Sequence, residues 1–312
     1  MTNDFQHISV LPEETLDCLL GNQPGLYLDC TLGGGGHTTR ILESHPENRV
    51  IGLDVDTEAL AHTTRKLAPY GDRFRSIRCN FGDIAQMAEQ EGIEGFDGIL
   101  MDIGVSSHQI DTGYRGFSYR EDGPLDMRMD NRLQLTASMI LNKYEEFELR
   151  RIFRVYGEEK FAGKIAKAIV ARREKKPWER TKELADLLIQ IYGYKKDKTP
   201  APARVFQALR IAVNKELEVL ENGLEHAFKL LKPNGKLAVI TFHSLEDRIV
   251  KHFFKVKAQG IDDHPDMPIA VHTVKSEGKL LTRKPITASE DERKNNPRAN
   301  CAKLRAIKKF KD

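Results

Sequence analysis

The hydrophobic positions in the first third of the chain follow two periods, that of a buried strand and that of an amphipathic helix. Apolar and β-branched runs at 26–31, 50–54 and 96–104, with an alternating segment at 74–81, predict four strands. Helical spacing begins again after the first two runs, at positions 38–42 and 57–67. Strands that alternate with helices predict an α/β fold with a largely parallel sheet.

The pattern changes in the middle of the chain and then returns. From about Thr136 to Tyr194 helical segments follow one another without a strand, and a polar break at 195–202 precedes further helices at 203–231. A strand pattern resumes at 236–242, and the alternating segment 302–310 predicts a final edge strand. We therefore expect one α/β domain, 1–106 with 214–312, interrupted by an all-helical insert at 107–213.

Four consecutive glycines, Gly33 to Gly36, follow the first strand directly and precede a helix. Glycines at the end of a buried strand allow a sharp turn and a close approach of the backbone to a ligand. Asp54 closes the next strand about twenty residues further on, the offset at which a carboxylate binds ribose hydroxyls. The sequence thus predicts a site for a nucleoside-bearing cofactor.

The identity of that cofactor depends on charge. Thr38 stands where a dinucleotide-binding fingerprint has its third glycine, which argues against an NAD-dependent dehydrogenase. Asp29, at the head of the turn, suits a cation better than a diphosphate. S-adenosyl-L-methionine, which carries a sulfonium and an ammonium group, is the better prediction.

Composition narrows the class of protein. The 312 residues are 40% hydrophobic with a net charge of only +3, so an anionic partner would be bound by local patches. The four cysteines are scattered without a C-x-x-C pair, which predicts reduced thiols and no metal site. Without a signal peptide pattern or a long apolar run, a cytoplasmic protein with no membrane contact is expected.

Two stretches are strongly basic. Eleven basic and four acidic residues lie between Arg150 and Arg180, and eight basic residues with no acidic one lie between Arg293 and Lys311. Such runs are often only the solvated face of a helix. The alternative is that the insert and the tail bind RNA together, with Arg172, Arg173 and Lys175 as the residues to test.

Eight separated strings, spread over nearly the whole chain, resemble the bacterial 16S ribosomal RNA cytosine-N(4) methyltransferase family, RsmH or MraW. They are GGGGH at 33–37, DIGVSS at 102–107, RGFS at 115–118, GPLDMRMD at 123–130, YGEE at 156–159, RVFQALR at 204–210, FHSLEDR at 242–248 and NPRA at 296–299. The resemblance implies a Rossmann-like class I methyltransferase sheet and methyl transfer from S-adenosyl-L-methionine to the exocyclic amino group of a cytidine in the decoding region. It also implies 16S rRNA, in the small ribosomal subunit or its precursor, as partner, and leaves a homodimer open.

The same resemblance implies the cofactor contacts. They are the turn residues Gly34, Gly35, Gly36 and His37, then Asp54 at the ribose, Phe81 near the adenine, and Asp102 and Gln109 around the methionine end.

Cytosine's amino nitrogen is a poor nucleophile because its lone pair is shared with the ring, so the enzyme must accept its hydrogens. Many amino-methyltransferases use an Asp/Asn/Ser-Pro-Pro-aromatic tetrad after the fourth strand, and this chain has Asp102-Ile103-Gly104-Val105 there. Asp102 and His243 are the candidate acceptors, although Asp102 could contact only the cofactor and His243 could only cap a helix. Phe117, Tyr119 and Arg298 are expected to hold the unpaired base.

Three other functions compete. A dehydrogenase lacks its third glycine, and a non-catalytic RNA-binding protein leaves the glycine turn, Asp54 and Asp102 unexplained. A small-molecule or protein methyltransferase on the same fold is the serious alternative, and the basic stretches argue against it because small substrates need no extended positive surface.

Overall fold

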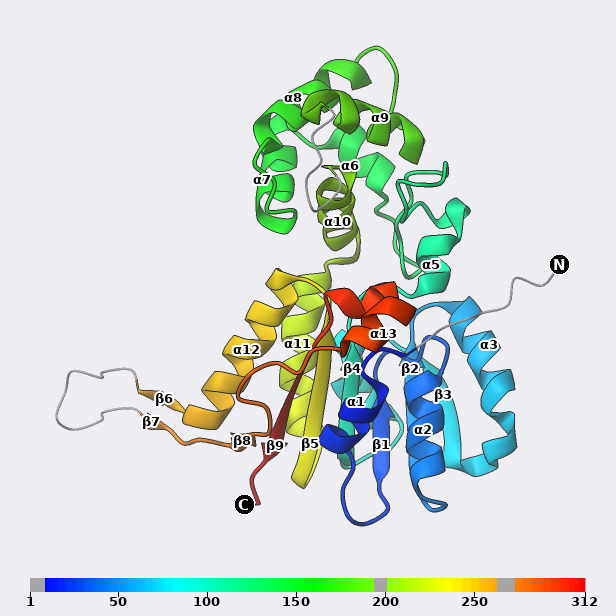
Figure 1. Cartoon of the computed structure of the whole chain (residues 1–312), viewed down its shortest axis with the longest axis vertical. Helices are drawn as coiled ribbons and strands as arrows, with labels where there is room; N and C mark the ends of the chain where they lie inside the picture. Colours follow the sequence, from blue (N-terminus) through cyan, green and yellow to red (C-terminus); the bar gives the residue numbers. More distant parts are fainter. Residues whose placement is uncertain (1–8, 194–200, 263–272, 312) are drawn as a thin grey trace. The chain divides into compact units, whose positions relative to one another are not determined.

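The computed structural model describes residues 9–193, 201–262 and 273–311 (Figure 1). It divides the chain into two compact units, one formed by 1–104 with 217–312 and the other by 105–216. The expected domain boundaries were 106/107 and 213/214. Most of the polar break expected at 195–202 lies outside the described residues.

The first unit is built on a seven-stranded sheet with the strand order β3-β2-β1-β4-β5-β9-β8 (Figure 1). Strands β1 to β5 are parallel, and β9 runs antiparallel between β5 and β8. The α/β prediction is confirmed. The strands are β1 (Leu26–Asp29), β2 (Arg49–Asp54), β3 (Phe74–Arg78), β4 (Phe96–Asp102), β5 (Leu231–Thr241), β8 (Gly278–Leu280) and β9 (Lys303–Lys309), with a separate ribbon of β6 (Ile261–Asp262) and β7 (Thr273–Val274).

Both faces of the sheet are covered, which explains why its central strands are almost wholly apolar. Along β5, Leu237 and Val239 pack on one face beneath α4 (Ile84–Gln90), α11 (Glu216–Leu230) and α12 (Ser244–Gln259). Ala238 and Ile240 point to the other face, toward α1 (Pro12–Leu19) and α2 (Gly36–Ser44). The remaining helices of this unit are α3 (Thr57–Leu67) and α13 (Glu290–Asn295).

Two predictions about the last strands were wrong. β9 is not an edge strand, because the three-residue β8 pairs with its outer side. β5 begins at Leu231, five residues earlier than expected, and reaches its regular register through a shift between Phe96 and Gly98 on β4. Asn234, near the start of β5, adopts a left-handed φ of 67°. The Pro-Asn-Gly sequence is therefore an irregularity inside β5 and not the boundary between helix and strand.

The second unit is helical. Its helices are α5 (Ser107–Asp111), α6 (Ala137–Lys143), α7 (Glu146–Tyr156), α8 (Ala162–Arg173), α9 (Thr181–Tyr192) and α10 (Ala201–Asn214). Trp178 is fully buried in their core and donates its indole N–H to the carbonyl of Ile169, 3.1 Å away. The long segment after β4 is ordered around this core, and Asn214 fixes it by bonding to the backbones of Met127 and Met129 at 2.8 Å.

None of the helices in the described ranges is both long and apolar enough to span a bilayer.

Candidate functional site

The predicted cofactor residues of the first unit lie at one edge of its sheet. β3, β2, β1 and β4 are neighbours and parallel, so their carboxyl ends meet there. The glycine turn follows β1, Asp54 ends β2, Phe81 comes three residues after β3, and Asp102 ends β4. Ligands of open α/β sheets bind at this edge, so the topology supports the site expected from sequence.

Long-range contacts hold the glycine turn in place. The N–H of Gly33 donates to Asp54 Oδ2 at 2.9 Å, and two residues of α3 donate to the turn's carbonyls: Thr63 Oγ1 to Gly33 at 2.6 Å and Lys66 Nζ to Gly34 at 2.8 Å. The sequence pattern does not identify Thr63 and Lys66, because nothing in a helical pattern marks which residues reach a turn about thirty positions away.

The turn is also closely packed. Gly35 has a left-handed φ of 70°, and a Cβ added to it would lie 2.5 Å from Thr63 Cγ2. A Cβ on Gly36 would lie 2.0 Å from Ser9 Oγ. Only glycine fits either position without displacing a neighbour.

Asp54 is bonded through both carboxylate oxygens. Oδ2 accepts from Gly33 and Oδ1 accepts from the N–H of Asp56 at 2.9 Å. Loss of solvent around the carboxyl raises the pKa of Asp54 to about 6, and the two N–H donors only partly oppose this. Each oxygen keeps a lone pair that a hydroxyl group could use.

Phe81 packs against α11 at a glycine. A Cβ on Gly223 would lie 2.7 Å from the Phe81 ring, so that glycine makes the close approach of ring and helix possible. The preceding Asn80 caps the short turn by accepting from Gly82 N–H at 3.0 Å. The ring is partly exposed at the carboxyl end of β3.

Asp102 is a buried carboxyl with one unsatisfied oxygen. It is 9% exposed, its N–H donates to Thr31 Oγ1 at 2.7 Å, and its Oδ2 lies 3.9 Å from His37 Nε2. Oδ1 has no hydrogen-bond partner among the described residues. Burial, with smaller contributions from the Asp29 and Glu246 charges, raises the pKa of Asp102 to about 7 against the opposing charge of Arg298. A buried, unpaired acceptor calls for an explanation, and a ligand group is the simplest.

Arg298 lies over an aromatic ring near this carboxyl. Its guanidinium carbon is 5.1 Å from the centre of the Phe242 ring, in a cation–π contact. The other two residues expected to hold a base belong to the second unit, where Phe117 lies in the core and Tyr119 packs against it. Phe117 is buried, and Tyr119 meets Phe206 edge to face at 5.8 Å.

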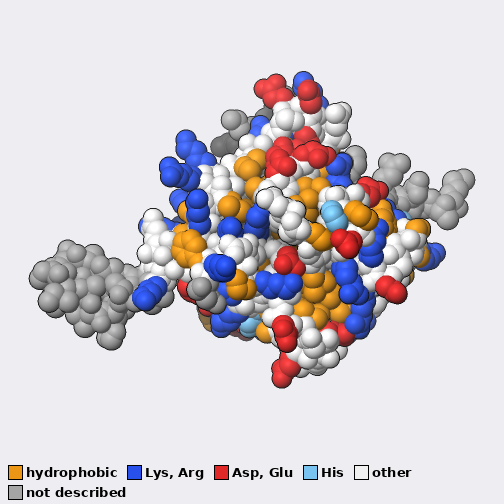
Figure 2. Space-filling view, turned by 90° about the horizontal axis from the view of Figure 1, so that it is seen from below, with side chains coloured by type: hydrophobic (Ala, Val, Ile, Leu, Met, Phe, Trp, Pro, Cys, Tyr) orange, Lys and Arg blue, Asp and Glu red, His pale blue; other side chains and the backbone are white. Residues whose placement is uncertain are grey.

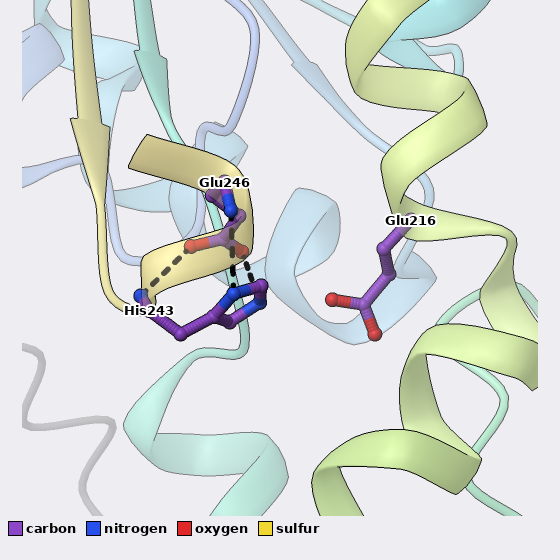
Figure 3. A group of neighbouring side chains, drawn as sticks. All are labelled: Glu216, His243 and Glu246. Carbon is purple, nitrogen blue, oxygen red and sulfur yellow. Dashed lines mark hydrogen bonds and ion pairs between the residues drawn. The ribbon is translucent and has the colours of Figure 1, made fainter. Parts of the chain in front are cut away.

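His243 is the N-cap of α12, which confirms the capping role left open for it as the alternative to proton acceptance. Its Nδ1 accepts from Glu246 N–H at 3.4 Å, and Nε2 lies 3.0 Å from Glu246 Oε1 (Figure 3). Glu246 Oε2 accepts in turn from the N–H groups of Phe242 and His243. Both ring nitrogens therefore face Glu246, in the reciprocal arrangement of a capping box.

Gln109 belongs to the second unit and makes a capping box of its own. Its N–H donates to Ser106 Oγ and its side-chain Oε1 accepts from Ser106 N–H, both at 3.1 Å. The side chain is thus held at the start of α5 and is almost fully buried.

Part of the basic charge predicted to meet RNA is paired or bonded within the protein. The guanidinium carbon of Arg172 lies 3.7 Å from the centre of the Trp178 ring, and the same group forms an ion pair with Glu183. Arg173 donates hydrogen bonds to carbonyl groups at the end of α6. In the tail, Arg305 and Lys303 both pair with Asp247. On the face drawn in Figure 2, basic and acidic side chains are interspersed. The length of a basic run is therefore a poor guide to a binding surface.

Comparison with known proteins gives a consistent result. The model of the MraW methylase family matches residues 4–310. A protein of Carboxydothermus hydrogenoformans named ribosomal RNA small subunit methyltransferase H is 49% identical over 308 residues, which are 98% of this chain and 99% of that protein. Proteins of the same name from Symbiobacterium thermophilum and Heliobacterium modesticaldum are 49% and 50% identical, over 98% of this chain and 97% and 99% of their own lengths.

Proposed function

The chain belongs to the MraW methylase family, and from this premise we propose that it methylates the exocyclic N(4) amino group of a cytidine in the decoding region of 16S rRNA, with S-adenosyl-L-methionine as methyl donor. The observation that carries the proposal is Asp102, a buried carboxyl with an unpaired oxygen beside the glycine turn. The small ribosomal subunit, or its precursor, is the substrate particle, which makes the cytoplasm the place of action.

The residues at the sheet edge fit this cofactor. Gly34, Gly35, Gly36 and His37 would line its methionine end, Asp54 would accept from the ribose hydroxyls, and Phe81 would contact the adenine. Two buried carboxyls, Asp29 and Asp102, suit the positive charge of its sulfonium and ammonium groups. When bound, the cofactor supplies an electrophilic methyl group. Gln109, in the second unit, is proposed to contact the methionine end from the start of α5.

Asp102 is the proposed acceptor for the amino hydrogens. Hydrogen bonding from the amino group to Oδ1 would return electron density to nitrogen, and the carboxylate would take a proton as the N–C bond forms and the bond between the methyl carbon and the donor sulfur breaks, with the demethylated cofactor as leaving group. A pKa of about 7 suits this task, because a base works best when its pKa lies near the working pH.

Arg298 is the proposed platform for the base. A cytosine in a duplex cannot reach a buried carboxyl, so the target nucleotide must be unpaired or flipped out. The guanidinium group, which is in cation–π contact with Phe242, offers a planar surface on which a base can lie. Phe117 and Tyr119 are not proposed for this role, because Phe117 is buried in a hydrophobic core and the partly exposed Tyr119 packs against the same core.

His243 is proposed as a structural cap and not as a second acceptor. Because Nδ1 accepts a backbone hydrogen bond, the neutral ring carries its proton on Nε2, which faces Glu246. The role as cap occupies Nδ1, and Nε2 lies against the Glu246 carboxylate at 3.0 Å.

Transfer of a labelled methyl group to small-subunit particles, followed by nucleoside analysis, tests the proposal. We expect the label in N(4)-methylcytidine at one position of the decoding region, with naked 16S rRNA as the comparison substrate. Label in another nucleoside would overturn the assigned atom. Label only in a protein or a small molecule would favour the alternative methyltransferase.

A further inference from the structure

One exposed face of the second unit carries basic side chains that form no ion pair with other described residues of the protein. Helix α7 buries Leu149, Ile152 and Phe153 and turns the opposite face to solvent. That face presents one aromatic and three arginines in the spacing i, i+3, i+4 and i+7, namely Phe147, Arg150, Arg151 and Arg154. Phe147 is 70% exposed, although a phenylalanine of a folded domain is usually buried.

The neighbouring helix extends this surface. α8 buries Ala162, Ile165, Ala166 and Ile169, and its exposed side carries Lys164 and Lys167. The Arg150 side chain lies along α8, since a Cβ on Gly163 would be 3.8 Å from its Cδ and Nε atoms. Gly163 is one turn from Lys167, so the arginine lies beside the lysines. We call these six residues, Phe147, Arg150, Arg151, Arg154, Lys164 and Lys167, the α7–α8 surface.

The five basic side chains of this surface make no ion pair or side-chain hydrogen bond with any other residue in the described ranges. Elsewhere in the same unit, three arginines are paired with carboxylates. Arg172 pairs with Glu183, Arg180 with Asp122, and Arg210 with Glu216. Unpaired arginines around an exposed phenylalanine form a surface that is complementary to an anion with planar rings.

We infer that the α7–α8 surface binds the phosphate backbone of the RNA substrate, with Phe147 stacking on an unpaired base. The inference rests on the proposed function and adds the place of contact. Guanidinium groups bind phosphate oxygens through paired hydrogen bonds, and aromatic rings among them stack on bases without regard to sequence. The basic run from Arg172 to Lys175 was the RNA contact suggested by the sequence. Arg172 and Arg173 of that run instead make contacts within the protein.

Binding of a 16S rRNA transcript, measured at several salt concentrations, tests this. The variant Arg150→Gln/Arg151→Gln/Arg154→Gln should bind at least tenfold more weakly at about 0.1 M salt, and the slope of log K against log salt should become shallower by about 2. Phe147→Ala should weaken binding by about tenfold with an unchanged slope, because stacking releases no counterions. Circular dichroism would check that these exposed substitutions leave the fold intact.

A matched control removes the same charge from the first unit. Lys251→Gln/Lys255→Gln/Lys284→Gln changes three exposed lysines that also lack an ion pair among the described residues. We expect its affinity to stay within twofold of wild type. An equal loss in the control, or an unchanged slope in the arginine variant, would overturn the inference. Failure of the wild-type protein to methylate small-subunit rRNA would overturn the proposed function instead.

Discussion

Gly33 and Asp54, which lie 21 positions apart in sequence, are joined by a hydrogen bond of 2.9 Å from the glycine N–H to the carboxylate Oδ2. The bond links the turn after β1 to the end of the neighbouring strand β2. Asp54, which is proposed to bind the ribose, therefore also holds the glycine turn that is proposed to bind the rest of the cofactor. A change in either part of the site should alter the other.

Asp54→Ala should weaken S-adenosyl-L-methionine binding by about 1.5 to 3 kcal/mol, the range for a hydrogen bond to a charged group. Calorimetry measures this directly.

Because the pKa of Asp54 is about 6, wild-type affinity for the cofactor should also fall as the pH is lowered through that value. Asp56→Ala is the control: it removes the cap of α3, lowers stability by about 1 kcal/mol and should leave affinity unchanged. Equal affinity in a folded Asp54→Ala protein would remove the ribose role.

Gly35→Ala should destabilise the protein by about 2 to 4 kcal/mol, from the left-handed φ and the contact with Thr63 together. Gly92 has a similar φ of 64° with nothing within 4 Å, so Gly92→Ala measures the backbone term alone, about 1 kcal/mol. Adding Thr63→Ser to Gly35→Ala should recover part of the difference, because it removes the Cγ2 atom. Urea unfolding provides the values, and equal losses at Gly35 and Gly92 would show that the turn is not tightly packed.

His243→Asn should keep both stability and turnover close to wild type, because asparagine is a good N-cap. His243→Ala should lose about 1 kcal/mol of stability. The comparison of the two variants separates a cap from a proton acceptor. If kcat falls on the order of a hundredfold in the folded asparagine variant, His243 takes part in the chemistry.

Arg172→Ala should destabilise the protein by about 1 to 2 kcal/mol, because it removes the stack on Trp178 and the pair with Glu183. Lys175→Ala should change stability by less than about 0.5 kcal/mol. Both variants should bind RNA as the wild type does. If a fully stable Arg172→Ala protein binds RNA more weakly than the wild type, the basic residues at 172–175 contact RNA after all.

The parallel strands, and the place of the glycine turn and Asp54 at the ends of two of them, could be predicted from sequence. Apolar runs determine which segments form buried strands, and parallel strands necessarily bring their carboxyl ends to one edge. The three-residue β8 could not be predicted, because so short a strand has no period of its own. The capping role of His243, left open from sequence, is confirmed, and the spacing from His243 to Glu246 is that of a capping box.

The roles of the basic residues could not be read from sequence at all. Arg150 and Arg172 lie in the same basic run, yet Arg150 is exposed on a helix face without an ion pair among the described residues, and Arg172 is stacked and paired. The difference comes from contacts with residues of other segments, such as Trp178 and Glu183. Arg298 likewise meets Phe242 only because β9 returns antiparallel beside β5.

Methyl transfer by Asp102→Asn, measured in a single turnover on small-subunit particles at saturating S-adenosyl-L-methionine, tests the central claim most directly. The substitution keeps the size of the side chain and removes its charge. We predict a fall in rate on the order of a hundredfold or more, with cofactor affinity far less affected. In the wild type, kcat/KM should rise with pH through about 7 as the carboxyl ionises, and the variant should lack that rise. Normal turnover at saturation with collapsed cofactor affinity would contradict the account and leave Asp102 as a cofactor ligand alone.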